Sequence, residues 1–221
     1  MKTIAIVLAG GVGMRMESDK PKQFLEIGDK PIVIHSLEAF QKHSGIDEII
    51  LVINEKFRDE FIALSDKYIF SKLQTVVSGG KERSDSSRNA LKKLSGYEPC
   101  KVLIHDAVRP YVSGDILSDI IRALDKHKAV NLAIPATETV LITNADDEIV
   151  SIPPRENVYL AQTPQGFHSD IILKAYELAY LDPDFKATDD CGVVHHYLPS
   201  IPIHIVKGSI ENKKITYPSD L

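Results

Sequence analysis

The sequence predicts a single α/β domain, built on a Rossmann-like, mainly parallel sheet with helices on both faces and a protruding β-hairpin arm. Three observations lead to this prediction. Short apolar runs typical of buried strands alternate with longer segments whose apolar residues recur at helical spacing. After residue 137 this alternation stops, and two β-branched runs flank a polar turn without a helix between them. The length of 221 residues suits one such domain with a sizeable core.

The first part of the chain follows the strand–helix rhythm of a parallel sheet. Ser113 is expected to cap a helix whose Ile116, Leu117 and Ile120 lie on one face. The expected strands cover residues 3–8, 48–53, 73–77, 102–105 and 130–134. The expected helices begin near residues 31, 56, 81 and 113.

The segment 137–158 is expected to form the arm. Its β-branched runs, residues 139–142 and 149–152, flank a turn at residues 144–147. A lone two-stranded ribbon is only marginally stable in water, so its apolar side chains need a cover. A second copy of the chain would supply that cover, and the sequence therefore predicts a homodimer formed through the arm.

The C-terminal part is expected to return to the sheet and complete the domain 1–221. Residues 158–162 would form the first strand after the arm. Ser169 and Thr188 would each cap a following helix. Residues 203–206 and 214–216 are expected as the closing strands.

Charge and composition exclude several classes of protein. A net charge of −5 argues against a general affinity for nucleic acid or for anionic membranes, which both require a basic face. No apolar segment approaches the roughly 20 residues of a membrane span. Cys100 and Cys191 lie far apart without CxxC spacing, which indicates reduced thiols and a cytoplasmic location.

Candidate functional residues cluster where the expected strands end. In an open parallel sheet, ligands bind outside the carboxyl ends of the strands. The first strand runs into a loop with Gly10, Gly11 and Gly13, and Arg15 and Lys22 follow at short spacing. Glycines let backbone N–H groups approach an anion closely, and two nearby cations suit a polyphosphate. The sequence therefore predicts a nucleoside triphosphate at this edge of the sheet.

The glycine loop does not fit the two commonest phosphate-binding patterns. It is not a Walker A loop, and Met16 stands where a dinucleotide-binding loop needs its third glycine. Asn54, not an acid, ends the second strand, which disfavours an NAD-dependent oxidoreductase. A non-catalytic nucleotide-binding module remains open, as does the view that the two cations are merely solvated. His195 and His196 lack a third ligand nearby, which disfavours zinc.

Five motifs follow one another along nearly the whole sequence, at residues 10–16 with 21–23, 79–83, 105–110, 162–165 and 212–216. In these motifs and in their order the chain resembles the sugar- and polyol-phosphate cytidylyltransferases. The resemblance implies transfer of CMP from CTP to a polyol phosphate, giving a CDP-polyol and pyrophosphate.

Two branches of this family use different polyol phosphates. One uses 2-C-methyl-D-erythritol 4-phosphate in isoprenoid biosynthesis, and the other D-ribitol 5-phosphate for teichoic acid or capsule precursors. Residues 108–111 and 152–155, together with Cys191, look more like the ribitol branch, and Ala161 looks more like the methylerythritol branch. Residues 217–220 lack an acid usual in the methylerythritol branch. The resemblance slightly favours D-ribitol 5-phosphate or a related pentitol phosphate, with 2-C-methyl-D-erythritol 4-phosphate as the alternative.

The implied reaction joins two anions, so the resemblance implies positioning and charge neutralisation rather than a general base. Mg²⁺ is expected with CTP, with Asp106 as an assisting ligand. Either Lys213 or Lys214 faces the site, because strand alternation turns only one of them inward. The implied catalytic residues are Arg15, Lys22 and Lys214. The implied nucleotide-binding residues are Leu8, Ala9, Gly10, Gly11, Gly13, Gly79, Gly80, Arg83, Ser86 and Asp106. The implied substrate-binding residues are Asp106, Arg109, Thr139, Arg155, Thr163, Thr188 and Thr216.

Overall fold

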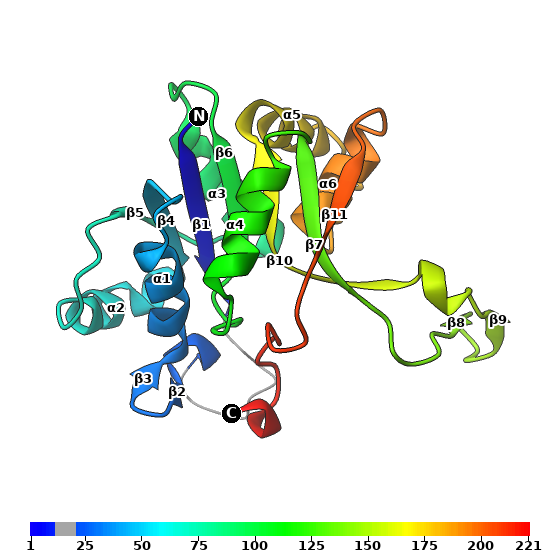
Figure 1. Ribbon diagram of the computed structural model, residues 1–221, viewed down its shortest axis with the longest axis horizontal. Helices are drawn as coiled ribbons and strands as arrows, with labels where there is room; N and C mark the ends of the chain where they lie inside the picture. Colours follow the sequence, from blue (N-terminus) through cyan, green and yellow to red (C-terminus); the bar gives the residue numbers. More distant parts are fainter. Residues whose placement is uncertain (12–20) are drawn as a thin grey trace.

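The centre of the molecule is a sheet, which the computed structural model describes within residues 1–11 and 21–221 (Figure 1). Its strands are β1 (Thr3–Ala9), β4 (Glu48–Ile53), β5 (Leu73–Ser78), β6 (Lys101–Asp106), β7 (Ala129–Pro135), β10 (Tyr159–His168) and β11 (Ile203–Lys207). Across these described ranges the strand order is β11-β7-β10-β6-β1-β4-β5. Every neighbouring pair is parallel except that β10 runs antiparallel to both β6 and β7. The prediction of a mainly parallel sheet is confirmed.

Helices cover both faces of the sheet, as the alternating pattern predicts (Figure 1). The helices α1 (Ile32–Lys42), α2 (Arg58–Ser65) and α4 (Gly114–Ala123) pack on one face. The helices α3 (Arg83–Leu91), α5 (Ser169–Ala179) and α6 (Asp190–Tyr197) pack on the other. Short 3₁₀ turns occupy η2 (Lys22–Phe24), η3 (Glu55–Phe57), η4 (Lys92–Leu94), η5 (Arg155–Asn157) and η6 (Pro218–Asp220).

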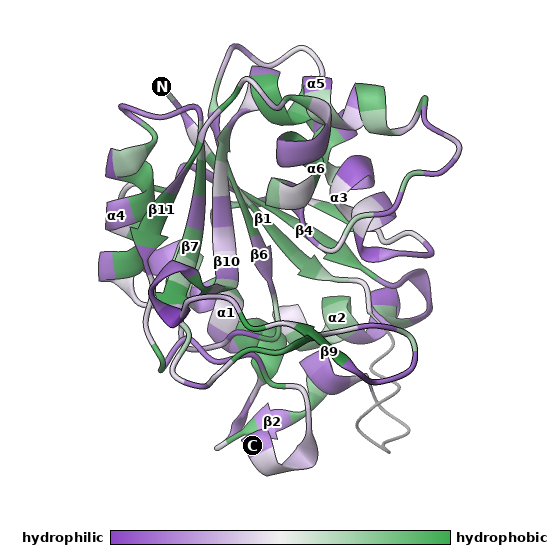
Figure 2. Ribbon diagram, turned by 90° about the vertical axis from the view of Figure 1, so that its right-hand side faces the viewer, coloured by the Kyte–Doolittle hydropathy of each residue, from purple (hydrophilic) through white to green (hydrophobic). Residues whose placement is uncertain are grey.

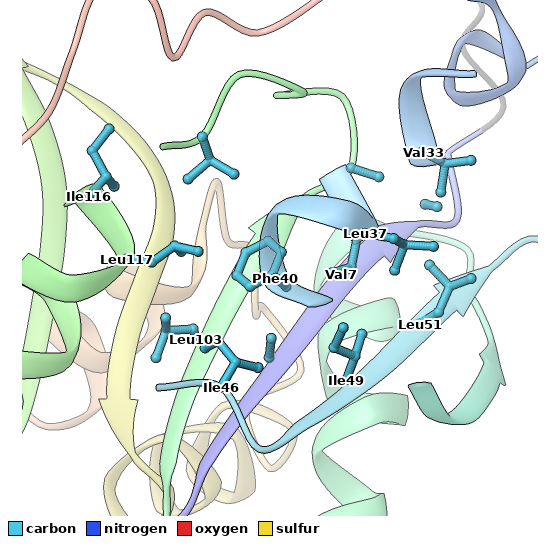
Figure 3. Packing of buried hydrophobic residues seen from close by; sticks show 14 of the residues in the cluster. Val7, Val33, Leu37, Phe40, Ile46, Ile49, Leu51, Leu103, Ile116 and Leu117 are labelled. Carbon is cyan, nitrogen blue, oxygen red and sulfur yellow. The ribbon is translucent and has the colours of Figure 1, made fainter. Parts of the chain in front are cut away.

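Strand β1 divides the core into two layers. Successive side chains of a strand point to opposite faces. Val7 therefore belongs to the cluster under α1, where it lies near Leu37 and Phe40 (Figure 3). Ile6 belongs to the cluster that α3 and α5 cover on the opposite face. Because β1 is buried along its whole length, its carboxyl end is held firmly in the middle of the sheet.

The arm leaves the sheet after β7 and returns in β10 (Figure 1). It holds a two-stranded ribbon of β8 (Ile142–Thr143) and β9 (Ile149–Ser151), which confirms the predicted hairpin. The turn includes Asp147 at φ 61°, a left-handed conformation that aspartate tolerates better than most residues. Figure 2 shows hydrophobic colouring on β9, which lies at the surface.

Two predicted helix caps are wrong by one residue, while Ser113 is confirmed as the N-cap of α4. Ser169 is the first residue of α5, because its buried Oγ accepts a hydrogen bond from the Cys100 amide at 3.1 Å. Thr188 precedes the true cap of α6, since the Asp189 carboxylate accepts from the Gly192 amide at 2.7 Å. In the first case a distant backbone amide, Cys100 N, engages the Ser169 hydroxyl, and in the second the adjacent Asp189 makes the capping hydrogen bond in place of Thr188.

The strand predictions fail in three places. Strand β10 continues to His168, well beyond the predicted residues 158–162. Residues 214–216 form no strand, because a single backbone hydrogen bond, from Ile215 N to the Val108 carbonyl at 2.8 Å, joins them to the neighbouring turn. A small hairpin of β2 (Glu26–Ile27) and β3 (Lys30–Pro31) was not predicted. None of the helices in the described residues is long and apolar enough to span a membrane.

Candidate active site

A cavity of about 230 Å³ opens at the carboxyl ends of β1 and β6. It lies where the sequence predicts ligands to bind, because parallel strands present their carboxyl ends at one edge. Backbone from the end of β1, the loop before α3, the end of β6 and a C-terminal segment all reach it. Its lining residues are Leu8, Ala9, Gly10, Gly11, Lys22, Gln23, Gly80, Lys81, Glu82, Arg83, Ser86, Asp106, Val108 and Lys214.

Close backbone packing requires glycine at positions 79 and 80 of this edge. A Cβ on Gly79 would lie 3.2 Å from the Gly10 Cα, so the two loops could not approach as they do. A Cβ on Gly80 would lie 2.0 Å from the Asp85 Cβ, which no adjustment of a side-chain tip could relieve. The Ser86 hydroxyl accepts a hydrogen bond from the Gly80 amide at 3.0 Å. The loop before α3 is thus fixed against the end of β1.

Gln23 holds the described part of the glycine loop in place. Its buried side chain donates from Nε2 to the carbonyls of Ala9 and Gly11, both at 2.8 Å. Lys22, its neighbour, lines the cavity and donates from Nζ to the Ile215 carbonyl at 3.2 Å. Sequence reasoning quoted Gln23 in a motif but gave it no role. The sequence feature that could have indicated a role for Gln23 is its position directly after Lys22.

Asp106, at the end of β6, joins two cations at the cavity. Its Oδ1 accepts from Arg83 Nε at 2.9 Å, and its Oδ2 accepts from Lys214 Nζ at 2.7 Å. Burial by itself would raise the pKa of Asp106, but the two cations outweigh it and hold that pKa well below its usual range. Lys214 therefore faces the site, while Lys213 is exposed and does not line the cavity.

Beneath Asp106 lies a buried chain of hydrogen bonds. The Asp106 amide donates to Thr163 Oγ1 at 3.0 Å, and Thr163 Oγ1 lies 3.1 Å from His105 Nδ1. His105 Nε2 lies 3.1 Å from the Arg109 carbonyl, which can only accept, so Nε2 carries the proton and Nδ1 accepts from Thr163. Burial lowers the pKa of His105 to about 4, which keeps its imidazole neutral.

Arg109 ties the turn after β6 to the segment that carries Lys214. Its guanidinium donates to the Asn212 carbonyl at 2.8 Å and to the Ala161 carbonyl at 3.4 Å. Asn212 is fully buried and donates to the Thr163 carbonyl at 2.9 Å. Because residues 213–216 lie outside any strand, these contacts determine where Lys214 stands.

The structure gathers most of the predicted nucleotide and catalytic residues but separates part of the predicted substrate set. Gly13 and Arg15 lie outside the described residues. Gly79 packs below the cavity against Gly10, and Thr163 lies behind Asp106. The predicted residues that line the cavity are Leu8, Ala9, Gly10, Gly11, Lys22, Gly80, Arg83, Ser86, Asp106 and Lys214.

Of the predicted substrate residues only Asp106 lines this chain's cavity; Arg109 and Thr163 do not line it, and neither do the four that follow. Thr139 and Arg155 lie on the arm, where Arg155 Nη2 approaches Thr139 Oγ1 at 3.5 Å. Thr188 is exposed just before α6, and Thr216 donates from Oγ1 to the Lys214 carbonyl at 3.3 Å.

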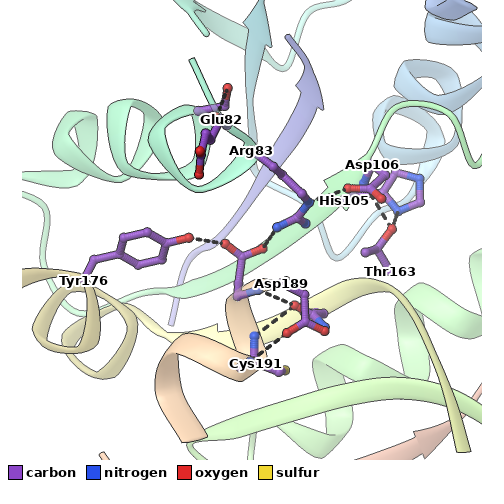
Figure 4. A network of polar contacts seen from close by, with 12 residues as sticks. Glu82, Arg83, His105, Asp106, Thr163, Tyr176, Asp189 and Cys191 are labelled. Carbon is purple, nitrogen blue, oxygen red and sulfur yellow. Dashed lines mark hydrogen bonds and ion pairs between the residues drawn. The ribbon is translucent and has the colours of Figure 1, made fainter. Parts of the chain in front are cut away.

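Sequence reasoning missed a buried polar network beside the cavity (Figure 4). Asp190 is fully buried and accepts from Arg83 Nη1 and from the Tyr176 hydroxyl, both at 2.7 Å. Gln165 Oε1 accepts from the Asp190 and Cys191 amides, both at 3.0 Å. The only local signal was an acid in the first turn of a helix, which is explained equally well by the helix dipole.

The described residues do not build a metal site of their own. Among them, no group of three His, Cys, Asp or Glu side chains is placed to hold an ion. Both oxygens of Asp106 already accept from cations. A Mg²⁺ ion at this edge would therefore be held mainly by phosphate oxygens of a bound nucleotide and by water.

Comparisons with known proteins agree with this arrangement. The family model described as 2-C-methyl-D-erythritol 4-phosphate cytidylyltransferase matches residues 3–221. A protein of that name from Bifidobacterium longum subsp. infantis is 42% identical over 224 residues, which cover 99% of this chain and 77% of the relative.

Two further comparisons extend the match. The Haemophilus influenzae bifunctional ribulose 5-phosphate reductase/CDP-ribitol pyrophosphorylase Bcs1 is 44% identical over 222 residues, covering 100% of this chain and 47% of the relative. The crystal structure of 4-diphosphocytidyl-2C-methyl-D-erythritol synthase from Anaerococcus prevotii superposes with a TM-score of 0.87 at 34% identity, covering 99% of this chain and 92% of that one.

Proposed function

Because the chain belongs to the 2-C-methyl-D-erythritol 4-phosphate cytidylyltransferase family, it is a CTP-dependent cytidylyltransferase for a polyol phosphate, and we propose that this substrate is 2-C-methyl-D-erythritol 4-phosphate. The family match over residues 3–221 carries the proposal. It is supported by the similarity to the Anaerococcus prevotii synthase over nearly the whole of both chains. The product would then be a CDP-polyol for isoprenoid biosynthesis.

The comparisons do not favour D-ribitol 5-phosphate, the substrate that a few motif residues slightly favoured, over 2-C-methyl-D-erythritol 4-phosphate. D-Ribitol 5-phosphate remains the second candidate for one reason. The Haemophilus influenzae relative, whose name includes CDP-ribitol pyrophosphorylase, is 44% identical across the whole of this chain. That relative is about twice as long as this chain, so its name covers a second activity as well.

The proposed reaction brings together two anions, the polyol phosphate and CTP. An oxygen of the polyol phosphate attacks the α-phosphorus of CTP, and the bond to the pyrophosphate breaks. The attacking phosphate is already an anion near neutral pH, so no residue needs to remove a proton. The protein's task is to hold the reacting groups in line and to stabilise the charge that accumulates on the α-phosphate.

Lys22 and Lys214 supply that positive charge in the proposed mechanism. They come from different segments and line the same cavity. Asp106 fixes Lys214 through a hydrogen bond of 2.7 Å and keeps its ammonium group oriented. Arg15 is proposed to add a third cation to the triphosphate. Mg²⁺ is proposed to arrive with CTP and to neutralise part of the triphosphate charge.

The nucleoside is proposed to bind between the end of β1 and the loop before α3. The backbone of residues 8–11 and of Gly80, with the Ser86 hydroxyl, lines this part of the cavity. Buried hydrogen-bonding groups can reject a wrong base because an unpaired group costs roughly 1–3 kcal/mol. These groups are therefore proposed to select cytosine.

The polyol phosphate is proposed to bind beside Asp106, with Arg155 and Thr139 reaching in from the arm of a second chain. A guanidinium suits a phosphate dianion because it donates two parallel hydrogen bonds. Arg109, Thr163, Thr188 and Thr216 are proposed to complete this side of the site. The homodimer thus becomes part of the proposed function.

A pyrophosphate-release assay tests the proposal. CTP, ATP, GTP and UTP are each combined with 2-C-methyl-D-erythritol 4-phosphate and with D-ribitol 5-phosphate, and kcat/KM is compared. We expect release with CTP and the methylerythritol phosphate, at least about tenfold above the ribitol phosphate, and loss of release in Lys22→Ala. A higher kcat/KM with D-ribitol 5-phosphate would establish the second candidate. No release with either polyol phosphate would refute both.

A further inference from the structure

Asp190 lies outside the cavity but is joined to it through Arg83. It is the first residue of α6 and is fully buried. Each carboxylate oxygen has one strong donor, Arg83 Nη1 on Oδ2 and the Tyr176 hydroxyl on Oδ1, both at 2.7 Å. Helices α3, α5 and α6 therefore meet at one buried carboxylate.

Arg83 bridges this carboxylate to the cavity. Its Nη1 donates to Asp190, and its Nε donates to Asp106 Oδ1 at 2.9 Å. Asp106 in turn accepts from Lys214 at 2.7 Å. The four side chains form a continuous row of alternating charge, with two acids and two bases. Burial would lower the pKa of Arg83, but Asp190 and Asp106 outweigh it and raise that pKa above its usual value.

Folding alone gives little reason for a carboxylate at this position. A buried ion pair often contributes no more stability than apolar side chains of similar volume. Cys191, Val193 and Val194, the neighbours of Asp190 on α6, are buried in an apolar cluster that could accept such a side chain. The row of charges therefore points to a role at the cavity that Arg83 lines.

The role follows from what an arginine does next to a triphosphate. A guanidinium donates readily to phosphate oxygens in a bidentate manner. Arg83 also has a buried Nη2 with no hydrogen-bond partner among the described residues, so its two ion pairs leave one N–H group of the guanidinium unused. Without Asp190, its full charge would be available to CTP and to the departing pyrophosphate, and its hold on Asp106 would loosen.

We infer that Asp190 is a positioning residue that holds Arg83 against Asp106 and shields part of its charge from CTP and pyrophosphate. This inference rests on the proposed function. The inference assigns different roles to the cations of the cavity. Lys22 and Lys214 act on the phosphates, while Arg83 orients Asp106 and, through it, Lys214. Asp190 thereby keeps pyrophosphate from being held too tightly after the reaction.

The test compares Asp190→Asn with Tyr176→Phe. The first removes the charge of the carboxylate, and the second removes one hydrogen bond to it but keeps the charge. Binding of CTP and of pyrophosphate is measured by calorimetry without polyol phosphate, and steady-state kinetics are measured with it. We expect Asp190→Asn to bind both ligands roughly 3- to 10-fold more tightly, since a compensating charge nearby has been removed. We expect its kcat to fall roughly tenfold, and its KM for CTP to fall as well.

Tyr176→Phe should keep both affinities and kcat within about twofold of the unsubstituted protein. A purely structural role predicts weaker or unchanged binding in both variants, and tighter binding is the signature of the inferred role. Unchanged or weaker binding in a folded Asp190→Asn protein, with a melting temperature near that of Tyr176→Phe, would overturn the inference.

A double variant keeps the test valid if Asp190→Asn does not fold. Arg83→Gln/Asp190→Asn removes both members of the pair and leaves no buried unpaired charge. Its CTP affinity should equal that of Arg83→Gln alone, because Asp190 acts through Arg83. Tighter binding in the double variant would overturn the inference. Failure of the unsubstituted protein to bind CTP would instead refute the proposed function.

Discussion

The rim of the cavity and the arm are built in opposite ways. At the rim, charged side chains satisfy one another within one chain, as Arg83 does with Asp106 and Asp190. On the arm, five apolar side chains that are between 49% and 64% exposed lie on or directly beside a ribbon of two short strands. These apolar side chains are Leu141, Ile142, Ile149, Val150 and Ile152. One chain completes the first region but leaves the second uncovered.

This difference indicates how the site is divided. The cavity gathers ten of the residues predicted for the nucleotide and for catalysis, whereas Thr139 and Arg155 lie on the arm. An exposed apolar ribbon is a natural contact for another copy of the chain. The nucleotide half is thus expected to work with residues of one chain, and the polyol-phosphate half with residues of two.

The largest effect is expected from Lys214→Ala, which removes a cation from the rim. The variant should lose roughly 100- to 1,000-fold in kcat, as is usual when one preorganised charge-stabilising group is removed. Its fold should persist, because the side chain is 41% exposed. Steady-state pyrophosphate release and a melting curve check both statements.

Lys213→Ala is the matched control, since Lys213 is exposed and lies outside the cavity lining. It should retain nearly full turnover. Equal losses in the two variants would contradict the assignment of Lys214 as the residue that faces the site.

Mixing two inactive variants tests the division of the site directly. Arg155→Ala damages the arm and Lys22→Ala damages the rim, so a mixed dimer has one site with both defects and one with neither. Random exchange of equal amounts should restore about a quarter of the activity of the unsubstituted protein. The measurement is turnover after subunit exchange, with size-exclusion chromatography to establish the dimer.

Two rim variants, Lys22→Ala and Lys214→Ala, provide the control for that mixture. They damage the same half of the site, in segments that both line one cavity. If the rim is completed by one chain, their mixed dimers contain no intact site and should stay inactive. Restoration in this pair, or its absence in the first pair under proven exchange, would refute the proposed division.

Elements that depend only on residues close together in the sequence could be predicted. Strand β4 was predicted with its observed bounds, because an apolar run buried on both faces needs no partner to be recognised. Ser113 was identified as a cap because it bonds to the Ile116 amide three residues away. The turn of the arm follows from the same kind of short-range chemistry.

Features that depend on distant residues could not be predicted. The buried network around Asp190 could not be predicted, because its partner Arg83 lies 107 residues away in the sequence. The partner of Lys214, Asp106, lies 108 residues away. The full length of β10, which continues to His168, was missed for a related reason. Its Gln162, Thr163 and Gln165 are polar, yet they are buried because they support the rim.

The smallest expected effect concerns stability, and it arises beneath the rim at His105. Burial lowers the pKa of this histidine from 6.5 to about 4 in the folded chain. Between pH 4 and 6.5 the unfolded chain therefore binds a proton that the folded chain does not, and stability rises with pH. At pH 5 the folded state loses roughly 2 kcal/mol relative to pH 7.5 from this residue alone.

His105→Asn should remove that part of the pH dependence. Urea unfolding at pH 5 and 7.5 gives the difference in free energy of unfolding, which should shrink by roughly 2 kcal/mol in the variant. Asp106 does not contribute to the difference between pH 5 and pH 7.5. Its pKa in the folded chain lies well below 3.8, so its titration changes the stability only at lower pH. His43, whose pKa burial also lowers, is present in both proteins and cancels in the comparison. An unchanged pH dependence in His105→Asn would mean that His105 takes up a proton in the folded chain, and the hydrogen bond from Thr163 to His105 Nδ1 would then have to be abandoned.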